Sequence, residues 1–350
     1  MNSNSSRLIP VAILIIVSFA ILSFLDYRSK AVTQAKHGFN RKMLKCSIDL
    51  KWEYKTGKRY FFAGHSSKQI FFYSSDPNKI VAITPYTGKV QIINSSRDSF
   101  NKDMKNAFSI RIYGRIAEVY DLNTASILKF NYDTKKIQQI KLPRNYSKIV
   151  KISPNSYVIK GFTVDGDNQE LYKFDLVKGE IRPGNNLLKK SYDAGLSVDG
   201  RLLFDTTSNT VVYVHLYSNR VLYLDSNLTL LGQGHTIDTF AGYYLQGKKV
   251  KKSAANPFFT VAKPPLYINT TAAVHNGFLY VSSAIKADNE TYETFTNNSV
   301  IDLYDIKSRA YSGTVYIPRH HDKRILSFDV SGDKIIASYP DAILTYHLDY

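Results

Sequence analysis

The strongest constraint on the fold of this chain is a recurring hairpin of two apolar strands joined by a short turn. The six hairpins begin at Gln69, Ile116, Tyr157, Val211, Phe278 and Lys334. Each is built from short runs of Val, Ile, Tyr, Phe and Leu between turn-forming residues, which is the pattern of β-strands. Beyond residue 46 almost no stretch of useful length has helical periodicity. The sequence therefore predicts an all-β domain.

The spacing of the hairpins predicts how many sheets the domain contains. The turns that follow corresponding strands align at Thr84, Asn131, Asp175, Asp225, Asp305 and His347. Successive intervals are 47, 44, 50, 80 and 42 residues, so four of the five match the size of a four-stranded propeller blade. Asn and Asp suit such turns because their side chains bond to the backbone two residues ahead. Six units predict a six-bladed β-propeller.

The two ends of the domain indicate how the ring closes. The sixth unit stops after its third strand, whereas residues 47–54 form a lone strand before the first unit. Pairing this strand with the last unit would complete the blade and remove an exposed edge. We therefore expect the propeller to cover residues 47–350, with insertions at about 234–267 and 285–298. The alternative is a β-sandwich or barrel whose strand spacing is coincidental.

By repeat length and turn pattern, residues 47–350 resemble the membrane-anchored or lipid-anchored six-bladed propellers of the TolB-like and NHL-like group, which includes many Bacteroidetes proteins. The chain differs from WD-type blades because it has a single Trp, Trp52, and no recurring Trp-Asp pair. The resemblance implies a scaffold or binding role, and in some members an enzyme with its site at the ring centre. It transfers no catalytic residue to this chain.

An uncharged apolar run, residues 8–25, precedes the domain. A helix of this length reaches roughly 27 Å, close to the roughly 30 Å hydrocarbon core of a bilayer. It predicts a transmembrane signal anchor between a short tail, residues 1–7, and a linker, residues 26–46. A cleaved signal peptide is the alternative, although no A-x-A site follows promptly.

The charges around the apolar run give conflicting indications of orientation. Lys and Arg residues after the run favour a cytoplasmic domain, but large domains often translocate regardless of such charges. We expect a bacterial cell-membrane protein with an exported, periplasmic domain.

The single cysteine, Cys46, excludes an internal disulfide. The net charge of +17 favours acidic partners, but an exported domain would rarely meet nucleic acid, so we predict none.

Long loops predict where binding occurs. Links from the fourth strand to the next blade, and from the second to the third strand, emerge on one face, which both insertions therefore share. Aromatic rings beside cationic side chains would suit an acidic surface polymer or a protein partner. The alternative is that the lysines are solvated and the rings hold the loop in place. The candidate binding residues are Tyr243, Tyr244, Lys248, Lys249, Lys251, Lys252, Phe258, Phe259, His320 and His321.

No chemical motif accompanies these residues. His320 and His321 are adjacent, and adjacent side chains of an extended segment point in opposite directions, so we predict no metal site and no cofactor. His215, within an apolar strand, is expected to be a hydrogen-bonded packing residue. The sequence has no G-x-S-x-G, P-loop or GxGxxG motif, and no catalytic residue is assigned. We expect a non-catalytic, membrane-tethered binding scaffold. The alternatives are an exported hydrolase, lactonase or cyclase with its site at the ring centre, and a sensory or assembly domain.

Overall fold

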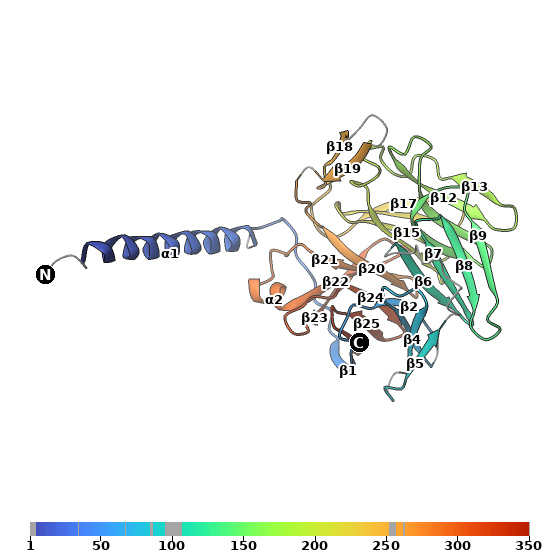
Figure 1. Cartoon of the computed structure of the whole chain (residues 1–350), viewed down its shortest axis with the longest axis horizontal. Coiled ribbons are helices and arrows are strands. Elements are labelled where there is room, and N and C mark those ends of the chain that lie inside the picture. Colours follow the sequence, from blue (N-terminus) through green and yellow to red (C-terminus); the bar gives the residue numbers. More distant parts are fainter. Residues whose placement is uncertain are drawn as a thin grey trace.

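Six four-stranded antiparallel sheets form the body of the protein, and each is a blade of a β-propeller (Figure 1). The computed structural model describes residues 5–33, 35–66, 68–84, 87–94, 107–251, 257–261 and 263–349. Within these residues all six predicted hairpins form the second and third strands of their blades. The six-bladed propeller is confirmed.

The first three blades run along the chain from the innermost to the outermost strand. Blade 1 consists of β2 (Phe61–His65), β3 (Ile70–Tyr73), β4 (Lys79–Ile83) and β5 (Val90–Asn94). Blade 2 consists of β6 (Phe108–Tyr113), β7 (Ile116–Asp121), β8 (Ser126–Asn131) and β9 (Ile137–Lys141). Blade 3 consists of β10 (Tyr146–Ser153), β11 (Ser156–Phe162), β12 (Gln169–Asp175) and β13 (Glu180–Pro183).

The last three blades include both insertions and the closure. Blade 4 consists of β14 (Gly200–Asp205), β15 (Thr210–His215), β16 (Arg220–Leu224) and β17 (Leu230–His235). A separate hairpin, β18 (Gly247–Lys251) and β19 (Pro257–Val261), follows it. Blade 5 consists of β20 (Asn269–His275), β21 (Phe278–Ser283), β22 (Asn298–Asp305) and β23 (Tyr311–Pro318), with α2 (Tyr292–Asn297) between β21 and β22. Blade 6 consists of β24 (Ser327–Ser331), β25 (Lys334–Ser338), β26 (Ala342–Asp349) and β1 (Ser47–Lys55).

The predicted ring closure is confirmed by β1, which is the outermost strand of blade 6. It pairs antiparallel with β26, and Trp52 lies opposite Thr345 in the register. The Thr56 N–H donates to the Asp341 carbonyl at 2.8 Å, so the pairing continues beyond the strand. Residues from the beginning and the end of the domain thus share one sheet, which gives β26 a partner along its outer edge.

Side-chain hydrogen bonds fix the turns between the third and fourth strands. The Asn131, Asp175, Asp225 and Asp305 side chains each accept a backbone N–H two or three residues ahead. This local bond stabilises a tight turn and agrees with the predicted alignment. His347 differs because it lies inside β26, opposite Asp49 of β1. The prediction of a turn at His347 is wrong, since β26 continues as a strand through Asp349.

Hydrophobic clusters between neighbouring blades hold the ring together. Six clusters each join one blade to the next, so the contact continues around the full circle. At the junction of blades 2 and 3, Tyr120 and Tyr157 pack edge to face with ring centroids 6.4 Å apart. At the closing junction, Phe72 of blade 1 lies with Ile343 of blade 6, and Trp52 of β1 packs against them. Burial on both faces explains why the middle strands are almost continuously apolar.

Residues 35–46, which the sequence assigned to a linker, lie against blade 5. Phe39 is buried, and the Asp288 carboxylate accepts the backbone N–H of His37 at 2.6 Å. Arg41 is 5% exposed and forms a buried bidentate ion pair with Asp302. This segment therefore attaches α1 to the propeller.

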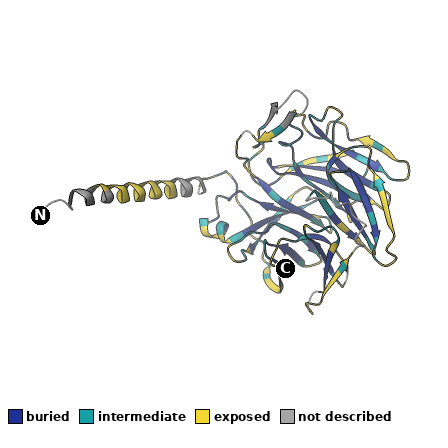
Figure 2. Ribbon diagram, viewed as in Figure 1, coloured by how far each residue is buried: buried dark blue, intermediate teal, exposed yellow. Residues whose placement is uncertain are grey.

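The first helix, α1 (Ser5–Thr33), extends away from the sheets (Figure 1). Its large apolar side chains between Ile13 and Leu25 are exposed along the rod (Figure 2). None of the helices formed by the described residues combines the length and the apolar character needed to cross a membrane.

Candidate functional site

The innermost strands of the six blades surround a central channel, with a cavity of about 490 Å³. Four basic side chains and one acidic side chain line it: Arg111, Lys148, Lys151, Arg201 and Asp329. These residues come from four different blades, through β6, β10, β14 and β24. Their convergence follows from the ring geometry, because the innermost strands of all six blades surround the same axis.

The two arginines of the central channel have no carboxylate partner among the described residues. The Arg111 guanidinium donates to the Phe62 carbonyl at 2.6 Å, and that of Arg201 donates to the Thr270 carbonyl at 3.0 Å. The Nε of Arg201 is buried without a hydrogen bond. Burial lowers the pKa of Arg201; the charge of Asp199 acts in the opposite direction, and that of Arg111 adds to the lowering. The channel thus contains two guanidinium groups, the exposed Arg111 and the half-buried Arg201, that an anion would pair with.

The two lysines of the channel are paired with carboxylates. The Nζ of Lys151 lies 2.6 Å from the buried carboxylate of Glu118 and also lies over the Tyr113 ring, 4.4 Å from its centroid. The Nζ of Lys148 lies 3.5 Å from the Asp199 carboxylate. Because these charges are already compensated, the arginines carry most of the unpaired positive charge.

Asp329 is the acidic group of the channel, and its environment disfavours ionisation. Burial raises the pKa of its carboxyl group to about 6, although the Val330 N–H, Arg111 and His275 act in the opposite direction. His275 lies nearby at the end of β20, where its Nε2 accepts the Gly332 N–H at 2.9 Å. Burial, followed by the charge of His65, lowers the pKa of His275. A carboxyl group that titrates near neutral pH can accept or donate a proton.

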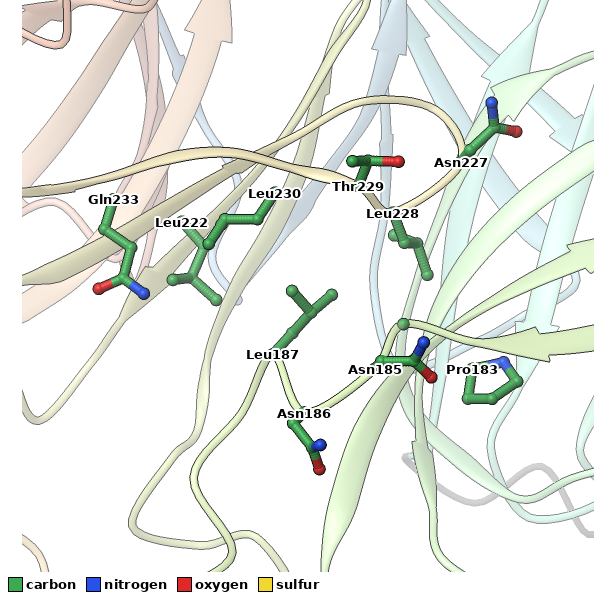
Figure 3. Close-up of a pocket in the computed structure, with 11 residues that line it drawn as sticks. Pro183, Asn185, Asn186, Leu187, Leu222, Asn227, Leu228, Thr229, Leu230 and Gln233 are labelled. Carbon is green, nitrogen blue, oxygen red and sulfur yellow. The ribbon is translucent and has the colours of Figure 1, made fainter.

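A second cavity lies on the rim between blades 3 and 4 (Figure 3). Its volume is about 380 Å³, and its lining combines Asn and Gln amides with leucine side chains but includes no charged residue. Asn227 at its edge accepts a hydrogen bond from Lys173 at 2.7 Å. This cavity therefore has fewer charged groups to bind an ion than the central channel has.

The two predicted tyrosines of the first insertion, Tyr243 and Tyr244, differ in how far they are exposed. Tyr243 packs edge to face against His215, with centroids 5.5 Å apart, and the guanidinium of Arg220 lies 5.5 Å from its ring centroid. Tyr243 thus holds the loop on blade 4. Tyr244 is 41% exposed and packs on Phe240 at a centroid distance of 5.3 Å. Of this pair, only Tyr244 presents a large free surface.

The remaining candidates of this insertion belong to the β18–β19 hairpin. Lys248, Lys249 and Lys251 lie in β18, and Phe258 and Phe259 lie in β19, where Lys249 is opposite Phe259 in the register. Among these five, the side chain is described only for Phe259, which is half-buried. Lys252 lies outside the described residues. A partner-binding role for this face stays a prediction.

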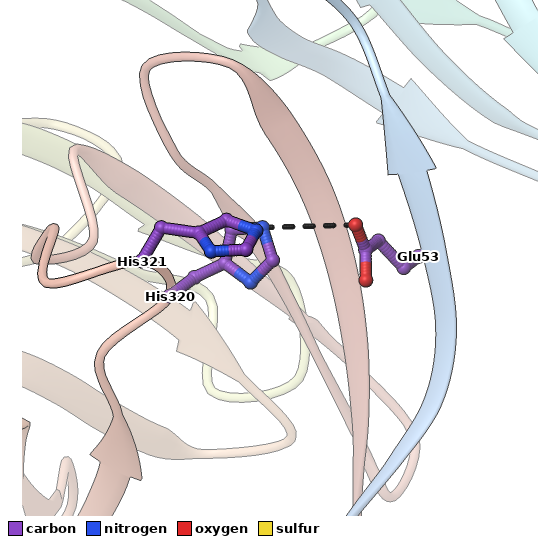
Figure 4. Close-up of side chains that lie close together, drawn as sticks. All are labelled: Glu53, His320 and His321. Carbon is purple, nitrogen blue, oxygen red and sulfur yellow. Dashed lines mark ion pairs between the residues drawn. The ribbon is translucent and has the colours of Figure 1, made fainter.

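His320 and His321 lie close together, contrary to the expectation for an extended segment. His321 and Asp322 have positive φ angles of 46° and 61°, and two backbone hydrogen bonds join His320 to Lys323. Positive φ at both central residues is the mark of a type I′ turn, which changes the direction in which successive side chains point. The rings come within 4.1 Å between centroids, and Glu53 of β1 lies beside them (Figure 4). The reasoning that separated the two histidines is wrong.

His215 packs as the sequence predicted, but its bonding differs. Its ring lies between Tyr213, at a centroid distance of 5.1 Å, and Tyr243. Its Nδ1 is buried without a hydrogen bond. Burial, together with the charges of Lys160 and Arg220, lowers the pKa of His215 to about 3. The ring is therefore neutral at physiological pH.

Sequence reasoning did not identify the residues of the central channel. A signal existed, because Arg111 and Asp329 interrupt short apolar runs, and Arg201 directly precedes one, in the first strand of their blades. A charged side chain in an innermost strand can reach the central channel, whereas burial without a partner disfavours a charge on the apolar faces between blades. This signal can be recognised only after the strands have been assigned to blades.

Comparison with known proteins supports the fold and leaves the activity undetermined. The sequence matches no protein-family model and no curated protein. Among solved structures, a member of the DUF4221 family from Bacteroides vulgatus has a TM-score of 0.54 and 9% identity, with 90% of this chain and 99% of that chain covered. A structural genomics protein of unknown function from Bacteroides thetaiotaomicron has a TM-score of 0.51 and 8% identity, with 87% and 76% covered.

Enzymes and binding domains both occur among the matched structures. A luciferin-regenerating enzyme, for example, has a TM-score of 0.49 and 12% identity, with 87% of this chain and 95% of that chain covered. At such identities the likeness shows the six-bladed propeller fold alone. The particular activity of this chain must therefore be argued from its own site.

Proposed function

We propose that this propeller is a binding module that holds a small anion, a carboxylate or a phosphate, in its central channel. The observation that carries the proposal is the pair of guanidinium groups, Arg111 and Arg201, which face the channel without a carboxylate partner among the described residues. A planar guanidinium matches the geometry of carboxylate and phosphate oxygens, so it selects this class of ligand. Arg201 is half-buried, so less water competes for its contact than for that of the exposed Arg111.

Calorimetric titration of the full chain in detergent tests the proposal. The probes are succinate, citrate and inorganic phosphate, with succinamide as an uncharged comparison. Arg111→Gln and Arg201→Gln should each weaken anion binding by about 10–100-fold, since each removes a charge-assisted hydrogen bond. Arg115→Gln is the matched control, because Arg115 is exposed and pairs with Asp133 at 2.6 Å.

Three results would contradict the proposed function. These are binding of succinamide as tight as that of succinate, weakening by Arg115→Gln as large as that by the channel variants, and no binding of any of the three anions. The control separates a specific channel effect from the loss of one charge in a chain whose net charge is +17.

A catalytic role is the second candidate, and Asp329 is the observation that favours it. A carboxyl group with a pKa of about 6, near the Arg111 guanidinium, has the properties of a general acid or base for a hydrolase, lactonase or cyclase. Asp329→Asn distinguishes the two roles. In a binding module it should leave anion affinity equal or higher, because it removes a negative charge. In an enzyme it should abolish turnover of a bound lactone or ester.

We also propose that the protein is anchored in a membrane and that its propeller lies outside the cytoplasm. The uncharged run at residues 8–25 supports a membrane anchor. We expect the propeller to be exported from a bacterial cell, as in the TolB-like and NHL-like proteins it resembles. A protein or an acidic surface polymer would then contact the face that carries the β18–β19 hairpin. Protease protection of spheroplasts, with and without permeabilisation, tests the orientation.

A further inference from the structure

A cluster of two histidines and one glutamate joins the closing strand to the link between blades 5 and 6 (Figure 4). Glu53 belongs to β1, whereas His320 and His321 lie between β23 and β24. One possible ligand atom from each residue lies within 4.8 Å of the others. The Nε2 of His320 and Oε1 of Glu53 are already 3.7 Å apart. We propose that these three side chains bind a divalent transition-metal ion, with Zn²⁺ as the best match.

The ligand types favour Zn²⁺ over harder cations. Two imidazoles and one carboxylate form the His₂Glu set that zinc accepts with tetrahedral geometry, leaving the fourth position for water. Calcium and magnesium prefer a shell composed of oxygen atoms. Small side-chain rotations would bring the three atoms to the spacing of a tetrahedral site. His321 is exposed and therefore has room to make its rotation.

The residues around this cluster favour the binding of a cation. His320 is held in place by the Tyr339 ring, with centroids 5.4 Å apart, and its side chain is only 12% exposed. The neighbouring positive charge of Lys323 is paired with Asp341 at 2.7 Å, which reduces its repulsion of an ion. The type I′ turn at His321 and Asp322 places both imidazoles on one side of the link.

The bound ion would connect two distant parts of the chain. Residue 53 lies in the strand that closes the ring, and residue 320 lies in the link that leads into the same blade. An ion bound by both would oppose separation of β1 from β26. Since the unfolded chain has no such site, metal binding would stabilise the closed propeller.

Zinc titration of the full chain in detergent, after removal of metal with EDTA, tests the site. We expect binding in calorimetry and a rise of about 3–6 °C in the unfolding midpoint when Zn²⁺ exceeds its dissociation constant 100-fold. Co²⁺ should give the visible absorption of a tetrahedral complex. His320→Gln and Glu53→Gln should each weaken Zn²⁺ binding at least about tenfold and remove most of the stabilisation.

His347→Gln is the matched control, because His347 also lies in blade 6 and pairs with Asp333 at 3.0 Å, outside the cluster. It should bind Zn²⁺ like the parent chain. Should a variant of His320 or Glu53 fail to fold without metal, His321→Gln replaces an exposed ligand and gives the same test. The proposal is overturned by an octahedral Co²⁺ spectrum, by absent Zn²⁺ binding, or by equal weakening in the His347→Gln control.

Discussion

Replacing Arg41 by Met should destabilise the junction between residues 35–46 and blade 5. The guanidinium of Arg41 forms two bonds to Asp302, at 2.9 and 3.0 Å, and one to Glu290 at 2.8 Å. The three side chains are almost fully buried. Burial by itself lowers the pKa of Arg41, but the carboxylates of Asp302 and Glu290 outweigh it and raise the pKa above its ordinary value. The guanidinium therefore stays charged in the folded protein.

Removal of this charge leaves two buried carboxylates without compensation. Breaking a buried ion pair in this way costs about 3–5 kcal/mol, whereas an exposed pair contributes about 0.2–1 kcal/mol. Arg115→Met removes an exposed partner of Asp133 and provides the comparison. Urea unfolding followed by tryptophan fluorescence measures the loss, since Trp52 lies in β1 of the neighbouring blade.

Limited trypsin digestion shows whether the loss is local. If residues 35–46 detach, cleavage after Lys42 and Lys45 should accelerate in Arg41→Met while the sheets stay intact. Asp302→Asn combined with Arg41→Met should recover part of the stability, because it removes one uncompensated charge. Equal free energies of unfolding for Arg41→Met and Arg115→Met, with unchanged digestion, would refute the reasoning.

Two further perturbations test the core of blade 4. The pKa of His215 is lowered to about 3 by burial, so its contribution to stability is complete above pH 6.5 and is lost as the pH falls toward 3, by up to about 1.4 kcal/mol per unit. His215→Phe should flatten this part of the stability profile between pH 7 and 5, and parallel urea profiles would contradict the assignment. Gly200→Ala should cost about 1–3 kcal/mol, because its new Cβ would lie 2.5 Å from the Tyr213 ring and 2.6 Å from the Val214 carbonyl oxygen. Gly242→Ala, whose Cβ would meet its nearest neighbour, the Tyr244 ring, at 3.4 Å, should change stability little in thermal unfolding, and equal losses would exclude the steric explanation.

The six blades could be predicted from the sequence, because the features that define them are local. Short apolar strands and Asx turns such as those at Asn131 and Asp175 recur at intervals close to one blade, and they predict the six sheets. The closing strand was also predictable, since an incomplete last unit and a lone first strand each lack a partner. Pairing β1 with β26 satisfies both requirements.

The contacts between side chains from different blades could not be predicted, because they depend on how the blades pack. Arg111, Arg201 and Asp329 are far apart in the chain, and they share the central channel because their strands occupy the same radial position in a ring. His320 and His321 come together because a turn with positive φ replaces the extended backbone that the sequence suggested. Arg41 pairs with Asp302 because residues 35–46 fold back onto blade 5. Local patterns specify backbone conformation, whereas distances between blades depend on packing of the whole ring.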